Sequence, residues 1–139
     1  MNENARPLIL IVDDETAVRE ILKLQLVGEG YDVRLADDPI VAGRSLREAP
    51  PDLMLVDISL PYQDGLDFAA ALKADAAAPQ VPIVFISGNP EVMSRALELG
   101  APCLKKPFSA TQLIDLVRRE LDKRVPRRRA RVDVLSAGF

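Results

Sequence analysis

The chain contains 139 residues, of which 48% are hydrophobic and 28% charged, so it is long enough to form one globular domain with a substantial core. It has no histidine and one cysteine, which excludes a histidine kinase, a histidine phosphocarrier, a histidine-based hydrolytic triad, zinc clusters and an internal disulfide. The formal net charge of −3 argues against general affinity for nucleic acid or anionic membranes, and the cysteine count fits a reducing compartment.

Five short runs rich in apolar and β-branched residues predict strands. In chain order they are Leu8–Val12, Asp32–Ala36, Leu53–Val56, Pro82–Ile86 and Pro102–Lys105. Three of the five are almost wholly apolar, which is typical of strands that are buried on both faces of a parallel sheet.

An amphipathic stretch with apolar residues three and four apart follows each predicted strand and indicates a helix. The predicted helices are Glu15–Val27, Ile40–Ala49, Gly65–Ala76, Glu91–Leu99 and Ala110–Lys123. Gly28 and Gly30 are expected to end the first helix, Gly100 to end the fourth, and Ser109 to cap the fifth. The alternation predicts an α/β fold in which a doubly wound parallel sheet carries helices on both faces.

The predicted pattern stops near Pro126. We expect residues 1–125 to form the domain and residues 126–139 to form a flexible basic tail. Four arginines against one aspartate give residues 125–139 a charge of +3, which leaves −6 for residues 1–124. The apolar run Pro7–Val12 is too short for a signal peptide or a membrane span. We therefore expect a soluble cytoplasmic protein with no membrane partner.

Carboxylates follow two of the predicted strands. The first strand runs into Asp13, Asp14 and Glu15, and the third runs into Asp57. Because ligands of a doubly wound sheet bind outside the carboxyl ends of its strands, these residues are expected to meet at one edge. Clustered carboxylates either raise a pKa or recruit a cation, and an all-oxygen ligand set favours a hard ion such as Mg²⁺.

A hydroxyl and an ammonium face the same acidic edge. Ser87 follows the fourth predicted strand, and Lys105 and Lys106 end the fifth. A carboxylate nucleophile, acidic metal ligands, a hydroxyl and a lysine together suit phosphoryl transfer. The ionised aspartate needs no general base, and the cation and lysine offset the charge of the phosphoryl oxygens.

Four motifs in order, IVDDE, LVDISLPYQDGL, FISGNP and LKKPF, resemble the receiver domain of two-component response regulators over about residues 7–124. The resemblance implies a flavodoxin-like sheet with strand order 2-1-3-4-5. It also implies a single-domain phosphorelay switch, with a sensor histidine kinase or a histidine phosphotransfer protein as donor. Its downstream target would be another protein, which the sequence does not identify.

The resemblance also implies which residues hold the metal ion and the phosphoryl group. Asp57 matches the phosphoacceptor and, with the main-chain carbonyl of Ser59, a Mg²⁺ ligand. Asp14 matches a direct ligand of Mg²⁺, and Asp13 a ligand that acts through water. Two further residues match those that contact the phosphoryl group, namely Ser87 and Lys106. The bond from Lys106 to Pro107 is predicted to be cis.

One position departs from the family pattern. Cys103 occupies the place where the family often has an aromatic residue that moves during signalling, and the segment GAPCLKKPF is one residue shorter than the common form. The resemblance further implies that Ser59 and Asn89 influence the lifetime of the acyl phosphate. Cys103 on its own is interpreted as a small core residue rather than as a redox sensor.

Simpler interpretations and two rival functions remain open at this point. Taken singly, Asp13 and Asp14 fit helix caps, Asp57 fits a turn, and Ser87 fits a plain strand end. A Mg²⁺-dependent phosphohydrolase with an aspartyl phosphate uses similar residues, although it usually needs a second acid where Ser59 stands. A nucleic-acid-binding regulator could use the basic tail, but specific DNA binding is not expected.

Overall fold

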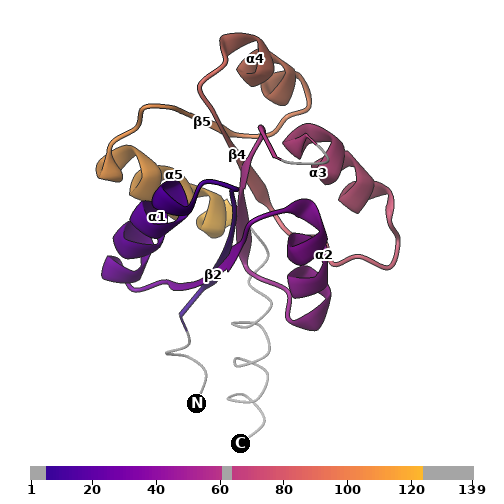
Figure 1. Ribbon diagram of the computed structural model, residues 1–139, viewed down its shortest axis with the longest axis horizontal. Coiled ribbons are helices and arrows are strands. Elements are labelled where there is room, and N and C mark those ends of the chain that lie inside the picture. Colours follow the sequence, from indigo (N-terminus) through magenta and orange to yellow (C-terminus); the bar gives the residue numbers. More distant parts are fainter. Residues whose placement is uncertain (1–5, 61–63, 124–139) are drawn as a thin grey trace, which may run out of the picture.

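The structure is a computed structural model that describes residues 6–60 and 64–123. The strands are β1 (Leu8–Val12), β2 (Asp32–Ala36), β3 (Leu53–Asp57), β4 (Ile83–Ser87) and β5 (Cys103–Lys105). The helices are α1 (Thr16–Gly28), α2 (Pro39–Glu48), α3 (Gly65–Ala74), α4 (Pro90–Glu98) and α5 (Ala110–Lys123). All strand pairs are parallel and the order is β2-β1-β3-β4-β5, which confirms the predicted fold class and strand order (Figure 1).

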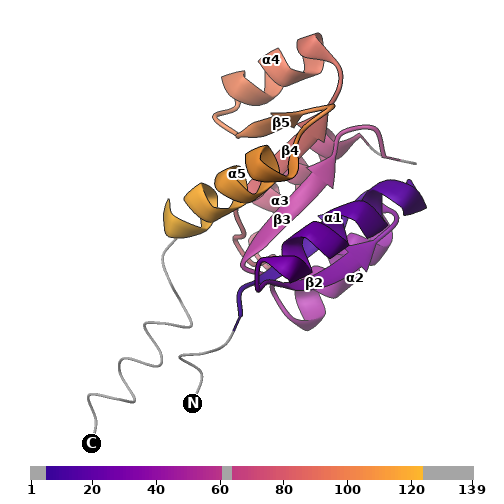
Figure 2. The same cartoon turned by 90° about the vertical axis from the view of Figure 1, so that its left-hand side faces the viewer.

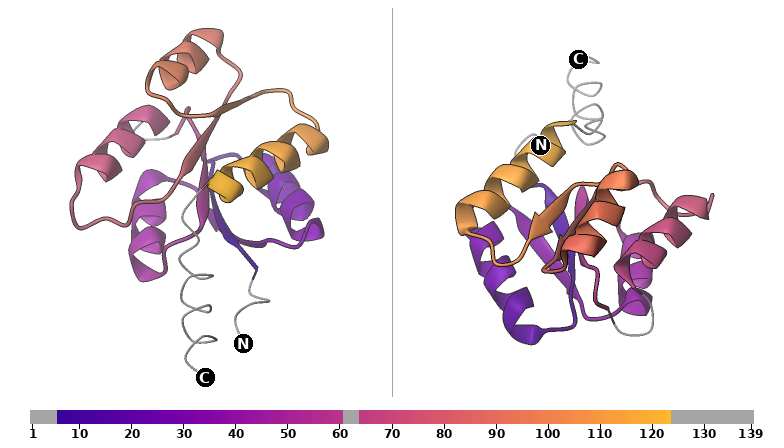
Figure 3. Two further views of the ribbon diagram at one scale, coloured as in Figure 1. Left: turned by 180° about the vertical axis from the view of Figure 1, so that it is seen from behind. Right: turned by 90° about the horizontal axis from the view of Figure 1, so that it is seen from above.

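The sheet separates two apolar layers because neighbouring residues of a strand point to opposite faces. Helices α1 and α5 cover one face, and Figure 2 shows them lying side by side over it. Helices α2, α3 and α4 cover the other face, as the two views of Figure 3 also show. In β1, for example, Ile9 and Ile11 pack with α1 and α5, whereas Leu10 and Val12 pack with α2, α3 and α4.

Side chains satisfy the free amides at the start of four helices. The residues that accept these amide hydrogen bonds are Asp38 for α2, Asp64 for α3, Asn89 for α4 and Ser109 for α5. Ser109 forms a reciprocal pair with Gln112, whose side-chain oxygen accepts from the Ser109 amide at 2.8 Å. The predicted cap of the fifth helix is therefore confirmed.

Several element boundaries differ from the predictions by one or two residues. The strand β3 extends by one residue to Asp57, which pairs with Ile86. The strand β4 begins and ends one residue later than predicted, and its last residue, Ser87, pairs with Lys105. The first helix ends at Gly28, one residue beyond the predicted bound at Val27, so the prediction that this glycine ends the helix is confirmed. The turn comes at Gly30, where φ is +95° and the amide donates to the carbonyl of Val27 at 3.0 Å.

None of the helices within residues 6–60 and 64–123 has the length and hydrophobicity that crossing a bilayer requires. The predicted tail, residues 126–139, lies outside the described residues, so its separation from the domain stays a prediction.

Candidate functional site

The parallel register brings the predicted site residues to one edge of the sheet. Val12 pairs with Val56. Asp13 and Asp57, which directly follow these two residues in the sequence, therefore come together. Ser87 pairs with Lys105 at the ends of β4 and β5. The amide of Lys106 then donates to the carbonyl of Ser87 at 2.9 Å, which fixes the lysine backbone beside β4.

Three carboxylates converge at this edge. Asp13, Asp14 and Asp57 each place one carboxylate oxygen within 4.8 Å of the others. Asp13 is 0% exposed and Asp57 is 3% exposed, whereas Asp14 is exposed to solvent. Neither Asp13 nor Asp14 is the N-cap residue of α1, because that position belongs to Glu15, whose side chain makes no capping hydrogen bond. The helix-cap interpretation of the acidic pair is thus not what the structure shows.

The two oxygens of Asp13 have different environments. Oδ1 accepts a hydrogen bond from the amide of Glu15 at 2.9 Å. Oδ2 is buried and has no hydrogen-bond partner among the described residues. Burial, with a smaller contribution from the charge of Asp57, raises the pKa of Asp13 from 3.8 to about 7. An unpaired buried carboxylate oxygen beside two more carboxylates is an environment that a hard cation would stabilise.

Asp57 is held from two sides. Its Oδ1 accepts from the amide of Ser59 at 2.9 Å, and its Oδ2 accepts from Lys106 Nζ at 3.1 Å. Glu15 Oε1 lies 4.0 Å from the same Nζ. Burial alone would lower the pKa of Lys106, but the charge of Asp57 and its hydrogen bond outweigh this, and the pKa is raised. The lysine is therefore fully charged at neutral pH and points at the carboxylate.

The other predicted residues lie beside this pair. Ser87 is 6% exposed, and its Oγ accepts from the amide of Asn89 at 3.0 Å. The peptide bond between Lys106 and Pro107 is cis, as predicted. Ser59 is exposed and adjoins the site through its amide, so the metal-binding role of its carbonyl stays a prediction.

Two residues at the site were missed by the sequence analysis. Arg19 Nη1 donates to the main-chain carbonyl of Asp13 at 2.7 Å and so braces the acidic loop. Arg19 lies near the start of α1, at the positive end of the helix dipole, where an arginine is unusual. This unusual position is the sequence feature that could have indicated its role. Gly65 begins α3 against β3, and a Cβ at this position would lie 2.7 Å from the carbonyl oxygen of Asp57. The sequence marks Gly65 only as a glycine after the cap residue Asp64.

Comparison with known proteins identifies similar chains over most of this one. The family model described as the response regulator receiver domain matches residues 9–118. The DNA-binding response regulator MtrA of Mycobacterium tuberculosis (strain ATCC 25618 / H37Rv) is 36% identical over 122 residues, which cover 86% of this chain and 52% of that protein. The chain thus spans about half the length of that relative.

Solved structures of similar chains have the same fold. The receiver domain of NtrX from Brucella abortus gives a TM-score of 0.76 at 34% identity, covering 84% of this chain and 99% of that one. The chemotaxis protein CheY4 of Vibrio cholerae gives a TM-score of 0.74 at 27% identity, covering 84% of this chain and 99% of that one.

Proposed function

Because the chain belongs to the family of response regulator receiver domains, we propose that it is a phosphorylation switch in which Asp57 accepts a phosphoryl group with the help of Mg²⁺. The observation that carries the proposal is the position of the Asp57 carboxylate. It is buried, it accepts a hydrogen bond from Lys106 at 3.1 Å, and it lies within 4.8 Å of two further carboxylates.

The acidic cluster fits the metal ion that receiver domains generally bind. Asp13, Asp14 and Asp57 would hold it, and the unpartnered Oδ2 of Asp13 supports this assignment. We propose the main-chain carbonyl of Ser59 as a further ligand. When bound, Mg²⁺ supplies positive charge that offsets the repulsion between the carboxylates and the incoming phosphoryl oxygens.

The proposed reaction requires only one nucleophile. A carboxylate oxygen of Asp57 attacks the phosphorus of a phosphohistidine on a partner protein, or of a small acyl phosphate. An oxygen–phosphorus bond forms, the bond from phosphorus to the donor breaks, and the donor leaves with the electron pair of that bond. Lys106, already charged and directed at Asp57, neutralises a phosphoryl oxygen. Ser87 is proposed to donate its hydroxyl hydrogen to another phosphoryl oxygen.

The proposed output is a change in protein–protein docking rather than turnover of a substrate. A sensor histidine kinase or a histidine phosphotransfer protein would act as donor, in the cytoplasm. MtrA is described as a DNA-binding response regulator, so DNA binding remains the alternative output. Salt-sensitive DNA binding that disappears when residues 126–139 are deleted would favour that alternative. Sustained hydrolysis of small phosphate esters would instead favour the phosphohydrolase.

The phosphoacceptor is tested by intact-mass measurement after incubation with acetyl phosphate and Mg²⁺. We expect the unmodified sequence to gain one phosphoryl group and Asp57→Asn to gain none. Asp122→Asn, which removes an exposed carboxylate on α5, is the matched control and should label normally. Chelation of the metal should suppress labelling. Equal labelling of the Asp57→Asn protein would overturn the assignment of the nucleophile.

A further inference from the structure

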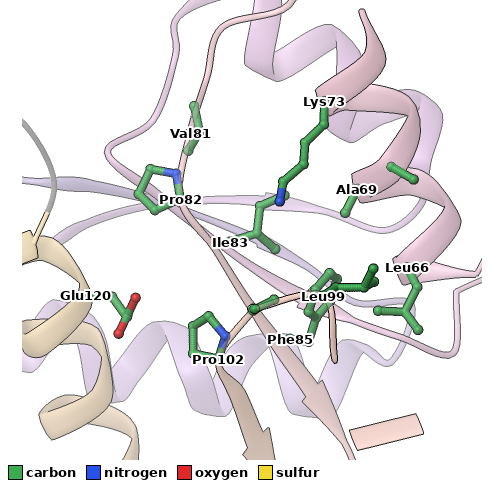
Figure 4. Close-up of a pocket in the computed structure, with 13 residues that line it drawn as sticks. Leu66, Ala69, Lys73, Val81, Pro82, Ile83, Phe85, Leu99, Pro102 and Glu120 are labelled. Carbon is green, nitrogen blue, oxygen red and sulfur yellow. The ribbon is translucent and has the colours of Figure 1, made fainter. Parts of the chain in front are cut away.

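A cavity of about 320 Å³ lies on the face of the sheet that carries α2, α3 and α4. It is bounded by α3, by the start of β4 and by the connection from α4 to β5 (Figure 4). Ile83 begins β4, while Ser87 and the phosphoryl site lie at the other end of that strand. The cavity is therefore separate from the acidic edge and takes no part in the function proposed above.

The walls of the cavity are mostly apolar. Leu66 on α3 and Phe85 on β4 line it, and both are almost fully buried core residues. Leu99 lines it from the end of α4 and is 60% exposed, although it is a large apolar residue. A leucine with this exposure beside a hollow in the core is an apolar surface that a ligand could cover.

Two charged side chains line the cavity, and among the described residues only one of them is paired with an opposite charge. Glu120 lines it from α5, but its side chain is only 12% exposed and its carboxylate accepts a hydrogen bond from Lys123 at 3.0 Å. Lys73 lines the opposite wall from the last turn of α3, and Figure 4 shows its amine directed toward Ile83. Within residues 6–60 and 64–123, Lys73 has no carboxylate within 4.0 Å. The cavity thus combines apolar walls with one uncompensated ammonium.

We propose that this cavity binds an amphipathic anion, meaning a small molecule with an apolar chain or ring and a single carboxylate. The apolar part would pack against Ile83 and Phe85, and the carboxylate would pair with Lys73. Burial of the chain supplies the driving force, and the ammonium selects the sign of the head group. A cationic head group is excluded by repulsion from Lys73, because the carboxylate on the opposite wall is already paired.

The proposal is tested on the full chain with octanoate as the probe. Its neutral and cationic counterparts, octanol and octylamine, keep the chain and change only the head group. We expect octanoate to shift the amide NMR signals of Ile83 and Gly100 in a saturable manner, octanol to do so more weakly, and octylamine to have no effect. Octanoate binding should weaken about tenfold or more in Lys73→Gln, which removes one charge-assisted hydrogen bond.

Two further variants locate the binding. Ala101→Leu places a larger side chain on the cavity wall and should abolish binding, whereas Lys23→Gln removes an exposed lysine on α1 and should leave it unchanged. Three results would each overturn the proposal. They are the absence of saturable octanoate shifts, equal affinity for octanoate and octylamine, and unchanged octanoate affinity in Lys73→Gln. A ligand-free dimer that Ala101→Leu dissociates would also overturn it, because a second copy would then occupy the cavity.

Discussion

The buried Asp13 carboxyl links the stability of the protein to pH. Its pKa is raised from 3.8 to about 7, mainly by burial, whereas in the unfolded chain it titrates near its ordinary value. Between about pH 4 and pH 7 the folded state therefore holds a proton that the unfolded state has lost. As far as this group is concerned, stability is greatest below about pH 4 and falls as the pH rises to about 7.

We expect the free energy of unfolding of the metal-free protein to fall by a few kcal/mol between about pH 5 and pH 8. Urea denaturation in the presence of a chelator measures it. The chain has no histidine, so few other groups titrate in this range. Asp13→Asn should flatten the dependence, because a neutral amide replaces the titrating group. A slope that survives in Asp13→Asn would contradict this explanation.

The sequence predicted the convergence of the carboxylates but not the difference between them. Asp13 and Asp14 are adjacent, and nothing in their local composition indicates that the first is fully buried and the second exposed. That difference depends on where β1 stops and on how the loop before α1 turns. Arg19 helps to fix this loop through the carbonyl of Asp13, a contact that only the folded backbone creates.

At the scale of elements, the start of α3 is packed against the end of β3. The Gly65 amide donates to the carbonyl of Ile58 at 2.8 Å, and a Cβ on Gly65 would lie 2.8 Å from the Cα of Ile58. The backbone near Asp57 is thus positioned by a helix that comes close only because its first residue has no side chain.

We expect Gly65→Ala to destabilise the protein by about 1–3 kcal/mol, because backbone atoms near Asp57 must move to admit the methyl group. Labelling by acetyl phosphate should also slow. Gly28→Ala is the matched control, since Gly28 is helical and a Cβ there would have no neighbour within 4 Å. This control should be neutral or slightly stabilising. Equal stability of the two variants in thermal denaturation would show that the close approach is relaxed at no cost.

The first residue of β5, Cys103, is where the sequence departs from the family pattern. Cys103, in place of the usual aromatic residue, is half-buried and packs at the edge of the layer beneath α3 and α4. Burial raises the pKa of its thiol, which agrees with a small packing residue and not with a reactive thiolate. The sequence identified this departure, and the packing of Cys103 agrees with its interpretation as a small core residue.

At the scale of the whole molecule, stability should decrease from the centre of the sheet to its edges. The residues of β3 are all buried and β1 is almost completely so, whereas β2 and β5 contain exposed residues. We expect amide hydrogen exchange, followed by NMR, to be slowest at Ile11 and Leu55. Exchange at Asp32 and Lys105 should be at least about tenfold faster. Uniform protection across the sheet would contradict this gradient.

The fold was more predictable than the details of the site, for a physical reason. Apolar periodicity depends on which face of each element is buried, so the runs around Leu8–Val12 and Ala110–Lys123 predicted their elements without knowledge of distant contacts. Strand order was implied by the family resemblance. The cavity beside Ile83 could not be predicted, because it depends on how far α3 lies from the connection that follows α4.

The direction of α5 determines what can be attached to this protein. The helix starts at Ala110, close to Lys106, and its 14 residues run about 21 Å away from that edge, to Lys123. Leu8 begins β1, and the strand ends at Val12 beside Asp13, so Leu8 also lies at the far end of the sheet from the acidic edge. A fluorescent reporter fused beyond either element would therefore leave the reactive face accessible to a bulky donor, and it would sense phosphorylation only through changes relayed across the interior.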